Sequence, residues 1–395
     1  MDTNMEKPRL LDRLRPNLIW IIFVTLGWYM FIAAFGHFAW ESLMESIKGS
    51  VSPAMFFTLD LYAATIVDIL TLFILCWLFV KNRYIWKSFL IKRGGNNYAA
   101  GDILTEDDAY ADLYGRRRNG LKMLGWGLLL GFLTNFFCIA CALLHGDIKL
   151  YFDCAASQIP YFLFSLFCVC IQSSAEELWC RGFMYERLHE RYPLWVAVAV
   201  NGVLFGLLHI FNPGADVIPI VGIIITGLSY SLLRWYSGSI WIAMGIHTGW
   251  NFTQNYLFGL PNSGLVSEAS VFHLGAANGT TTWVYDWVFG VEGGIPALFI
   301  DGLLGAIIIY LACRNGRIKE LGMNRVRTLE AHGLKMRVEE AAPVTPVNVE
   351  PEDSAVPETV EAEAAQAENT VVSNSKPAAA EAAPAETVVE EYTEE

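Results

Sequence analysis

The stretch MLGWGLLLGFLTNFFCIACALL, residues 123–144, carries no charged side chain and is long enough to cross a bilayer as one helix. A hydrocarbon core roughly 30 Å thick needs about 20 apolar residues of α-helix. Because such runs recur along the chain, we predict about eight transmembrane helices and an all-α, polytopic membrane protein. The predicted spans are residues 18–40, 55–80, 122–144, 160–185, 194–211, 217–236, 239–258 and 294–313.

The composition also favours a lipid environment. Of the 395 residues, 54% are hydrophobic and only 17% are charged, whereas soluble domains carry about 25% charged residues. The net charge of −13 comes from the C-terminal end, where residues 339–395 hold 15 acidic residues and one basic residue. The rest of the chain is close to neutral, so we expect no nucleic acid among its partners.

The distribution of basic residues predicts the topology. If the N-terminus is cytoplasmic, 25 of the 27 Lys and Arg residues lie in cytoplasmic segments or at the adjoining helix ends, and only Lys48 and Lys149 lie outside. This bias is the one that the positive-inside rule describes. We therefore predict that both termini are cytoplasmic. Without a eukaryotic targeting feature in the sequence, we expect a multi-pass protein of a bacterial plasma membrane.

The predicted spans and the composition divide the chain into five segments. Beyond residue 339 the sequence is rich in Ala, Glu, Pro and Val and cannot bury enough apolar surface to fold. The segments are a cytoplasmic N-terminus (1–17), N-terminal transmembrane helices with a cytoplasmic loop at 81–121 (18–158), a core that carries polar motifs (159–258), an extracytoplasmic loop with the last helix and a basic segment (259–338), and a disordered acidic tail (339–395).

One apolar run also contains a helix-packing pattern. Gly127 and Gly131 are four residues apart, with three leucines between them. Small residues at this spacing let the backbones of two membrane helices approach closely. We therefore expect this face of the helix to pack against another helix.

Strongly polar residues concentrate in three of the predicted helices. Such residues are costly inside a membrane, so each of them needs a physical reason. They occur in the stretches AEELWCR (residues 175–181), FGLLH (205–209) and HTGWN (247–251). The other polar residues of the spans match no motif, and we assign them to packing or to interfaces. They are Asp60, Asp68, Asn135 and Asp301.

Helical spacing assigns these side chains to faces. Glu177 and Arg181 are four residues apart and can form an ion pair on one helix stripe. Glu176 is rotated by about 100° from Glu177 and points elsewhere, into the bundle. His247 and Asn251 are also four residues apart and present an imidazole and a carboxamide to one cavity.

With His209 from a third helix, this set offers a carboxylate base, two imidazoles and an amide donor. These groups suit the hydrolysis of a peptide bond by an activated water molecule. Each residue also has a structural alternative. Glu177 and Arg181 could be only a structural bridge, and the histidines and Asn251 could be only interhelical hydrogen-bonding residues.

The order E-E-x-x-x-R, F-x-x-x-H and H-x-x-x-N on separate membrane helices resembles the CPBP group. These are the CAAX-processing and bacteriocin-processing intramembrane proteases, which include the type II CAAX prenyl endopeptidase. The resemblance covers roughly residues 160–258, about a quarter of the chain, and every signature position is present. It implies a peptidase that acts on a peptide or protein substrate, which could itself be associated with the membrane.

The resemblance also implies a role for each motif residue. Glu176 would be the general base that activates water, and His209 would help to position or deprotonate it. His247 and Asn251 would stabilise the oxyanion of the tetrahedral intermediate. The supporting residues would be Glu177 and Arg181, which orient Glu176.

Family members have been described both as zinc metalloproteases and as metal-independent glutamate proteases. Glu176, His209 and His247 could supply three protein ligands of a catalytic zinc ion and leave one position open for water. No H-E-x-x-H motif supports the zinc mechanism. Both mechanisms stay open on the sequence.

The depths of the motif residues predict where the fourth helix ends. At 1.5 Å per residue, His209 lies about 21 Å along its helix from Trp195. Glu176 reaches a similar depth, about 22 Å, only if its helix continues to Arg191. We therefore predict a fourth helix that starts later than residue 160 and continues to about Arg191.

Two other classes of protein compete with the endopeptidase. The first is a non-catalytic membrane scaffold or immunity protein of the same fold, against which the intact Glu, His, His and Asn set argues. The second is a proton-coupled transporter in which Glu176 and the histidines relay protons. Transporters usually show two repeated halves, and the sequence has no such internal symmetry.

Overall fold

The computed structural model describes residues 120–334, except for 153, 155–157, 268–269 and 276–278, together with a few isolated positions before residue 67. Several predictions therefore lie outside the described residues. They concern the first two spans, the loop at 81–121, the acidic tail, Asp60 and Asp68.

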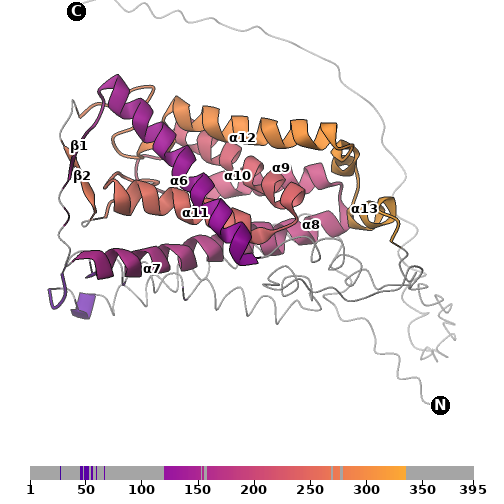
Figure 1. The fold of residues 1–395 in the computed structure, drawn as a ribbon, viewed down its shortest axis with the longest axis horizontal. Coiled ribbons are helices and arrows are strands. Elements are labelled where there is room, and N and C mark those ends of the chain that lie inside the picture. Colours follow the sequence, from indigo (N-terminus) through magenta and orange to yellow (C-terminus); the bar gives the residue numbers. More distant parts are fainter. Residues whose placement is uncertain are drawn as a thin grey trace, which may run out of the picture. The chain divides into compact units, whose positions relative to one another are not determined.

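The described part of the chain is a bundle of helices (Figure 1). Its α-helices are α6 (Gly120–His145), α7 (Ile159–Glu177), α8 (Tyr185–Arg191), α9 (Leu194–Leu208), α10 (Val217–Ser237), α11 (Ile240–Asn251), α12 (Ile295–Arg314) and α13 (Arg325–Ala331). Two π-helices, η2 (Leu178–Met184) and η3 (Phe252–Leu257), follow α7 and α11, and the 3₁₀ helices are η4 (Val291–Gly293) and η5 (Ile318–Gly322). The predicted helical fold is confirmed for this part of the chain.

A small antiparallel sheet accompanies the helices. Strand β1 (Lys149–Phe152) pairs with β2 (Phe272–Gly275), and Lys149 lies opposite Gly275. The sequence analysis did not predict these strands. Strands of four residues contain too few alternating positions to give a clear periodic signal.

Four helices of the described residues are long and apolar enough to cross a membrane. They are α6, the continuous helix Ile159–Arg191 that joins α7, η2 and α8, then α10 and α12. Helix α9 is apolar but shorter. These helices support a membrane-embedded protein, whereas the count of eight spans and the orientation of the termini stay predictions.

The fourth predicted span differs from its prediction at one end. Its continuation to Arg191 is confirmed. The expected start later than residue 160 is wrong, because α7 begins at Ile159. Pro160 lies in the first turn, where backbone N–H groups have no acceptor within the helix, so a residue without an N–H group is tolerated there. The apolar residues after Pro160 continue the helix.

The segments that carry the polar motifs lie next to one another, because η2 contacts both α9 and α11. Helix α11 lies against α6 and α7, while α10 lies against α9 and α12. In Figure 1, α6 crosses α11, and α7 and α12 flank the group on opposite sides. This arrangement brings the ends of α7 and α9 towards the face of α11 that carries His247.

The contact between α6 and α11 is made by glycines. A Cβ atom on Gly127 would collide with the carbonyl oxygen of Ile242, and one on Gly249 would collide with that of Leu128. Gly131 and Gly245 are equally crowded by the opposite backbone. The predicted packing role of the glycine pattern on α6 is confirmed, and a matching pattern on α11 completes it.

Candidate active site

Two of the three motifs lie where an α-helix changes into a π-helix. Glu176 and Glu177 are the last residues of α7, and η2 begins directly after them. Asn251 is the last residue of α11, and η3 follows it. Short π-helical segments within helices occur frequently at functional sites. The two transitions therefore indicate the same residues as the motifs.

The predicted ion pair of the first motif is present and fully buried. Arg181 Nη1 lies 2.9 Å from Glu177 Oε1, and neither side chain is exposed. Arg181 also donates to the carbonyl oxygen of Gly227 (3.3 Å), and its guanidinium lies 4.2 Å from the centroid of the Phe205 ring. The pair therefore connects η2 with α9 and α10.

Glu177 has a second partner, which the sequence analysis did not assign. Its Oε1 atom lies 3.1 Å from Nδ1 of His247 on α11. A carboxylate that accepts a hydrogen bond from one ring nitrogen fixes the orientation of an imidazole. The carboxylate of Glu177 thus contacts His247, and its expected role in orienting Glu176 stays a prediction.

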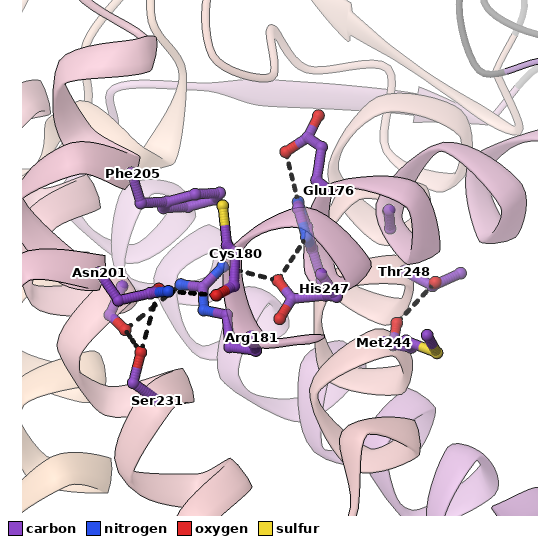
Figure 2. Close-up of polar contacts among 12 residues, drawn as sticks. Glu176, Cys180, Arg181, Asn201, Phe205, Ser231, Met244, His247 and Thr248 are labelled. Atoms are coloured by element: carbon purple, nitrogen blue, oxygen red, sulfur yellow. Dashed lines mark hydrogen bonds and ion pairs between the residues drawn. The ribbon is translucent and has the colours of Figure 1, made fainter. Parts of the chain in front are cut away.

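The other ring nitrogen of His247 faces the neighbouring glutamate. Nε2 of His247 lies 3.9 Å from Oε2 of Glu176, whose side chain is 18% exposed (Figure 2). As the spacing predicted, Glu176 and Glu177 point in different directions, yet both approach the same imidazole. His247 thus lies between one buried carboxylate and one that faces a cavity.

A chain of amide and hydroxyl groups links Glu176 to Asn251. Gln172 donates from Nε2 to Glu176 Oε1, and Ser173 Oγ contacts Gln172 Oε1 at 3.3 Å. Asn251 Nδ2 lies 3.4 Å from Ser173 Oγ. The sequence analysis missed Gln172 and Ser173. The signal for Gln172 was its position four residues before Glu176, on the same helix stripe.

His209 lies at the C-terminal end of α9. Its Nδ1 atom lies 2.8 Å from the carbonyl oxygen of Phe205, so this nitrogen donates and Nε2 is left as the acceptor. The two rings of His209 and Phe205 meet edge to face, with centroids 5.0 Å apart. These contacts fix the imidazole at the end of the helix.

All four predicted catalytic residues line one cavity of about 140 Å³: Glu176, His209, His247 and Asn251. Residues that the sequence analysis did not assign to the site also line it, among them Tyr230, Asn255, Ser263 and Glu292. A second cavity of about 180 Å³ shares Glu176 and His209 with the first and is otherwise mainly apolar. It lies among Trp179, Met184, Leu204, Phe205, Leu208 and Leu265.

Two polar residues that we assigned to packing have the expected contacts. Asn135 donates to Gln254 Oε1 at 2.7 Å. Asp301 accepts from the Thr226 hydroxyl at 2.5 Å, and its backbone carbonyl accepts from Ser229 at 2.7 Å. Asp301 also lines the cavity, which its isolated position on the sequence did not predict.

The three possible zinc ligands, Glu176, His209 and His247, line the same cavity, and their role as ligands stays a prediction. Within the part of the chain that the structure describes, no three His, Cys, Asp or Glu side chains lie close enough together to hold a metal ion. No step below depends on a metal.

Carboxylates, two imidazoles and carboxamides line the cavity between apolar helices, and such groups can take up and donate protons. Residues 156–253 match the family model described as Type II CAAX prenyl endopeptidase Rce1-like. No curated protein and no solved structure matches the chain.

The family match confirms the predicted resemblance to the CPBP and CAAX proteases. It covers about a quarter of the chain, and all three motifs lie within it. The match implies a membrane-embedded peptidase with a peptide substrate.

Proposed function

We propose that the chain is an intramembrane endopeptidase in which Glu176 activates the attacking water molecule. The observation that carries the proposal is the pair of Glu176 Oε2 and His247 Nε2, 3.9 Å apart at the wall of the cavity. This separation is too long for a direct hydrogen bond. It leaves room for a water molecule that donates to Glu176 and contacts His247.

The proposed reaction moves one proton through Glu176. The carboxylate takes a proton from water as the oxygen attacks the carbonyl carbon of the peptide bond, which gives a tetrahedral oxyanion. The protonated Glu176 then gives the proton to the leaving amine as the carbon–nitrogen bond breaks. Breaking the bond gives a carboxylic acid and an amine, and the acid's proton passes to the amine as the products leave as a carboxylate and an ammonium, with the carboxylate of Glu176 regenerated.

Donors for the oxyanion come from α11. Asn251 offers its Nδ2 group as a donor. A protonated His247 offers its Nε2–H group, while its Nδ1–H group stays hydrogen-bonded to Oε1 of Glu177. His209 faces the cavity from α9 with Nε2 free to accept a hydrogen bond from the water. Fixed donors at a developing charge need little reorganisation during the reaction.

The apolar second cavity supports a substrate with an apolar group near the scissile bond. It shares Glu176 and His209 with the polar cavity, so a group bound there lies beside the reacting atoms. The family description names prenylated CAAX peptides as the substrates of the related enzymes. We propose a peptide or protein substrate that carries a lipid or a large apolar side chain.

The substitution Glu176→Gln tests the catalytic role, with Glu190→Gln as its matched control. Both glutamates lie on the continuous helix Ile159–Arg191, and each side chain is 18% exposed. Glu190 pairs with Arg187 (2.8 Å) and Arg325 (3.3 Å) and does not line the cavity. General base catalysis contributes about 10²–10⁴-fold, so Glu176→Gln should lower kcat by that factor while Glu190→Gln keeps the turnover.

The assay follows cleavage of a peptide that the parent protein cuts, and size-exclusion chromatography in detergent verifies that each variant folds. Parent-like turnover by Glu176→Gln would refute the proposal. A chelator titration on the parent should leave turnover unchanged, since the proposed water is activated without a metal. Loss of activity that Zn²⁺ restores would instead favour the zinc mechanism.

A further inference from the structure

A third carboxylate lines the polar cavity, and it lies outside the three motifs and outside the family match. Glu292 belongs to η4, just before α12. Its Oε1 atom accepts from the indole Nε1 of Trp250 at 2.8 Å. Its Oε2 atom accepts from the backbone N–H and from the hydroxyl of Ser263, both at 2.7 Å.

These three donors stabilise the carboxylate of Glu292 in its partly buried position. Burial raises the pKa of Glu292, and the hydrogen bonds from Ser263 and Trp250 act in the opposite direction. The donors come from two parts of the chain. Trp250 is the residue directly before Asn251 on α11, and Ser263 belongs to the turn at 261–265, which we name the roof turn.

The roof turn is held in a conformation that its sequence does not favour. Ser263 has a φ of 48° and is the only residue other than glycine with a positive φ among those that the structure describes. Left-handed backbone is uncommon for a serine. Besides its two bonds to Glu292, Ser263 accepts a hydrogen bond from Asn212 Nδ2 at 3.0 Å. Asn262 and Leu265 close the turn through two backbone hydrogen bonds of 2.8 and 2.9 Å.

The roof turn lines the cavities that hold the catalytic residues. Asn262 and Ser263 line the polar cavity, and Leu265 lines both cavities. Asn255 Nδ2 donates to the Leu265 carbonyl at 2.9 Å, which ties the turn to η3. None of the atoms proposed to react belongs to this turn, so its contribution is to the walls of the substrate site.

We propose that Glu292 is a positioning residue for substrate binding, because it fixes the roof turn over the cavity and holds it against the end of α11. The roof turn then presents Asn262 and Leu265 to the peptide beside the scissile bond. This inference rests on the proposed peptidase function. It goes beyond that function because it assigns substrate binding to a segment that carries no motif.

The substitution Glu292→Gln tests this role. The carboxamide keeps one acceptor oxygen, but its NH₂ group cannot accept from the remaining donors. One lost hydrogen bond to a charged group corresponds to about a tenfold change in an equilibrium constant. We expect KM to rise about tenfold with kcat little changed. This pattern results when a variant loses binding energy that the ground state and the transition state share equally.

Glu320→Gln is the matched control. Glu320 is also a buried carboxylate that accepts from an indole N–H, that of Trp235 at 2.9 Å, but it does not line either cavity. A purely structural effect of losing such a carboxylate would appear in both variants as a lower unfolding temperature. A rise in KM should appear only in Glu292→Gln.

Ser263→Ala removes the hydroxyl donor, keeps the backbone donor and should raise KM by a smaller factor. If Glu292→Gln does not fold, this variant carries the test. An unchanged KM in the folded variants would overturn the inference, and so would a loss of kcat as large as that of Glu176→Gln. Failure of the proposed function itself would show separately, as parent-like turnover by Glu176→Gln.

Discussion

Glu176 and Glu186 lie ten positions apart in the same continuous helix, and their surroundings differ. Glu186 is fully buried and lies 2.6 Å from Nη2 of Arg234. Glu176 faces a cavity, where its ionisable neighbour is the imidazole of His247. The comparison separates a carboxylate that is paired with an arginine from one that faces a cavity beside a histidine.

The physical reason for the difference is the cost of burying charge. A carboxylate within apolar surroundings has to be paired or protonated. The other glutamates of this helix are paired with arginines: Glu177 with Arg181, Glu186 with Arg234 of α10, and Glu190 with Arg187 and with Arg325 of α13. Among the described ion pairs, Glu176 has only its histidine partner.

Removing the arginine of the structural pair should have the largest effect on stability. In Arg234→Ala the buried Glu186 loses its counter-charge, and breaking a buried ion pair costs about 3–5 kcal/mol. We expect a large fall in the free energy of unfolding, measured by thermal unfolding in detergent, while the folded fraction keeps its kcat. An unchanged unfolding temperature would show that the two acids do not differ as described.

Glu177→Gln tests the comparison further, because Glu177 resembles Glu186 in its arginine partner and Glu176 in its contact with His247. It pairs with Arg181 and also contacts His247. Loss of a buried charged hydrogen bond should cost about 1–3 kcal/mol of stability. Since a carboxylate that orients an imidazole also supports catalysis, kcat should fall as well. Glu186→Gln, the control, should reduce stability alone, and an unchanged kcat in Glu177→Gln would confine Glu177 to a structural role.

The smallest expected effect concerns pH. Burial opposes the ionisation of Glu320, but hydrogen bonds and the charge of Arg317, together with Trp235 and His332, lower its pKa overall. The unfolded chain, with a glutamate pKa of about 4.3, then binds more protons than the folded one. The stabilisation is complete above that pH and is lost as the pH falls through the folded pKa.

Glu320→Gln should therefore flatten the acid side of the stability profile. The measurement is the unfolding temperature of both proteins from neutral pH down to about pH 3, because the stabilisation is lost below the unfolded pKa of glutamate, about 4.3. Each unit by which the folded pKa lies below the unfolded one corresponds to about 1.4 kcal/mol, so the stability that the parent loses relative to the variant reports the difference between the two pKa values. Parallel profiles for parent and variant would contradict the assignment.

The sequence predicted the parts of the site that depend on helical spacing. The Glu177–Arg181 pair follows from a separation of four residues within one helix. The shared cavity of Glu176, His209 and His247 followed from the motifs and their resemblance to a family. The roles of these residues stay proposals.

The missed features depend on tertiary packing. Glu292 of η4 accepts hydrogen bonds from Ser263, which lies in a loop, and from Trp250 of α11. No spacing rule relates three such positions. The contact of Glu177 with His247 likewise joins residues that are 70 positions apart. The π-helices after Glu177 and Asn251 also carry no simple sequence pattern.

The glycine contact of α6 with α11 determines which parts of the site can move. The backbones of α6 and α11 touch without an intervening layer of side chains. Sliding of one helix along the other would therefore push carbonyl oxygens into the backbone of the opposite helix. We expect the two helices to behave as one rigid body. His247 and Asn251 lie on that body, whereas Glu176 lies on α7 and His209 lies at the end of α9. Admission of a peptide would then displace α7 or α9, so the proposed general base and the proposed oxyanion donors would separate and reassemble in every catalytic cycle.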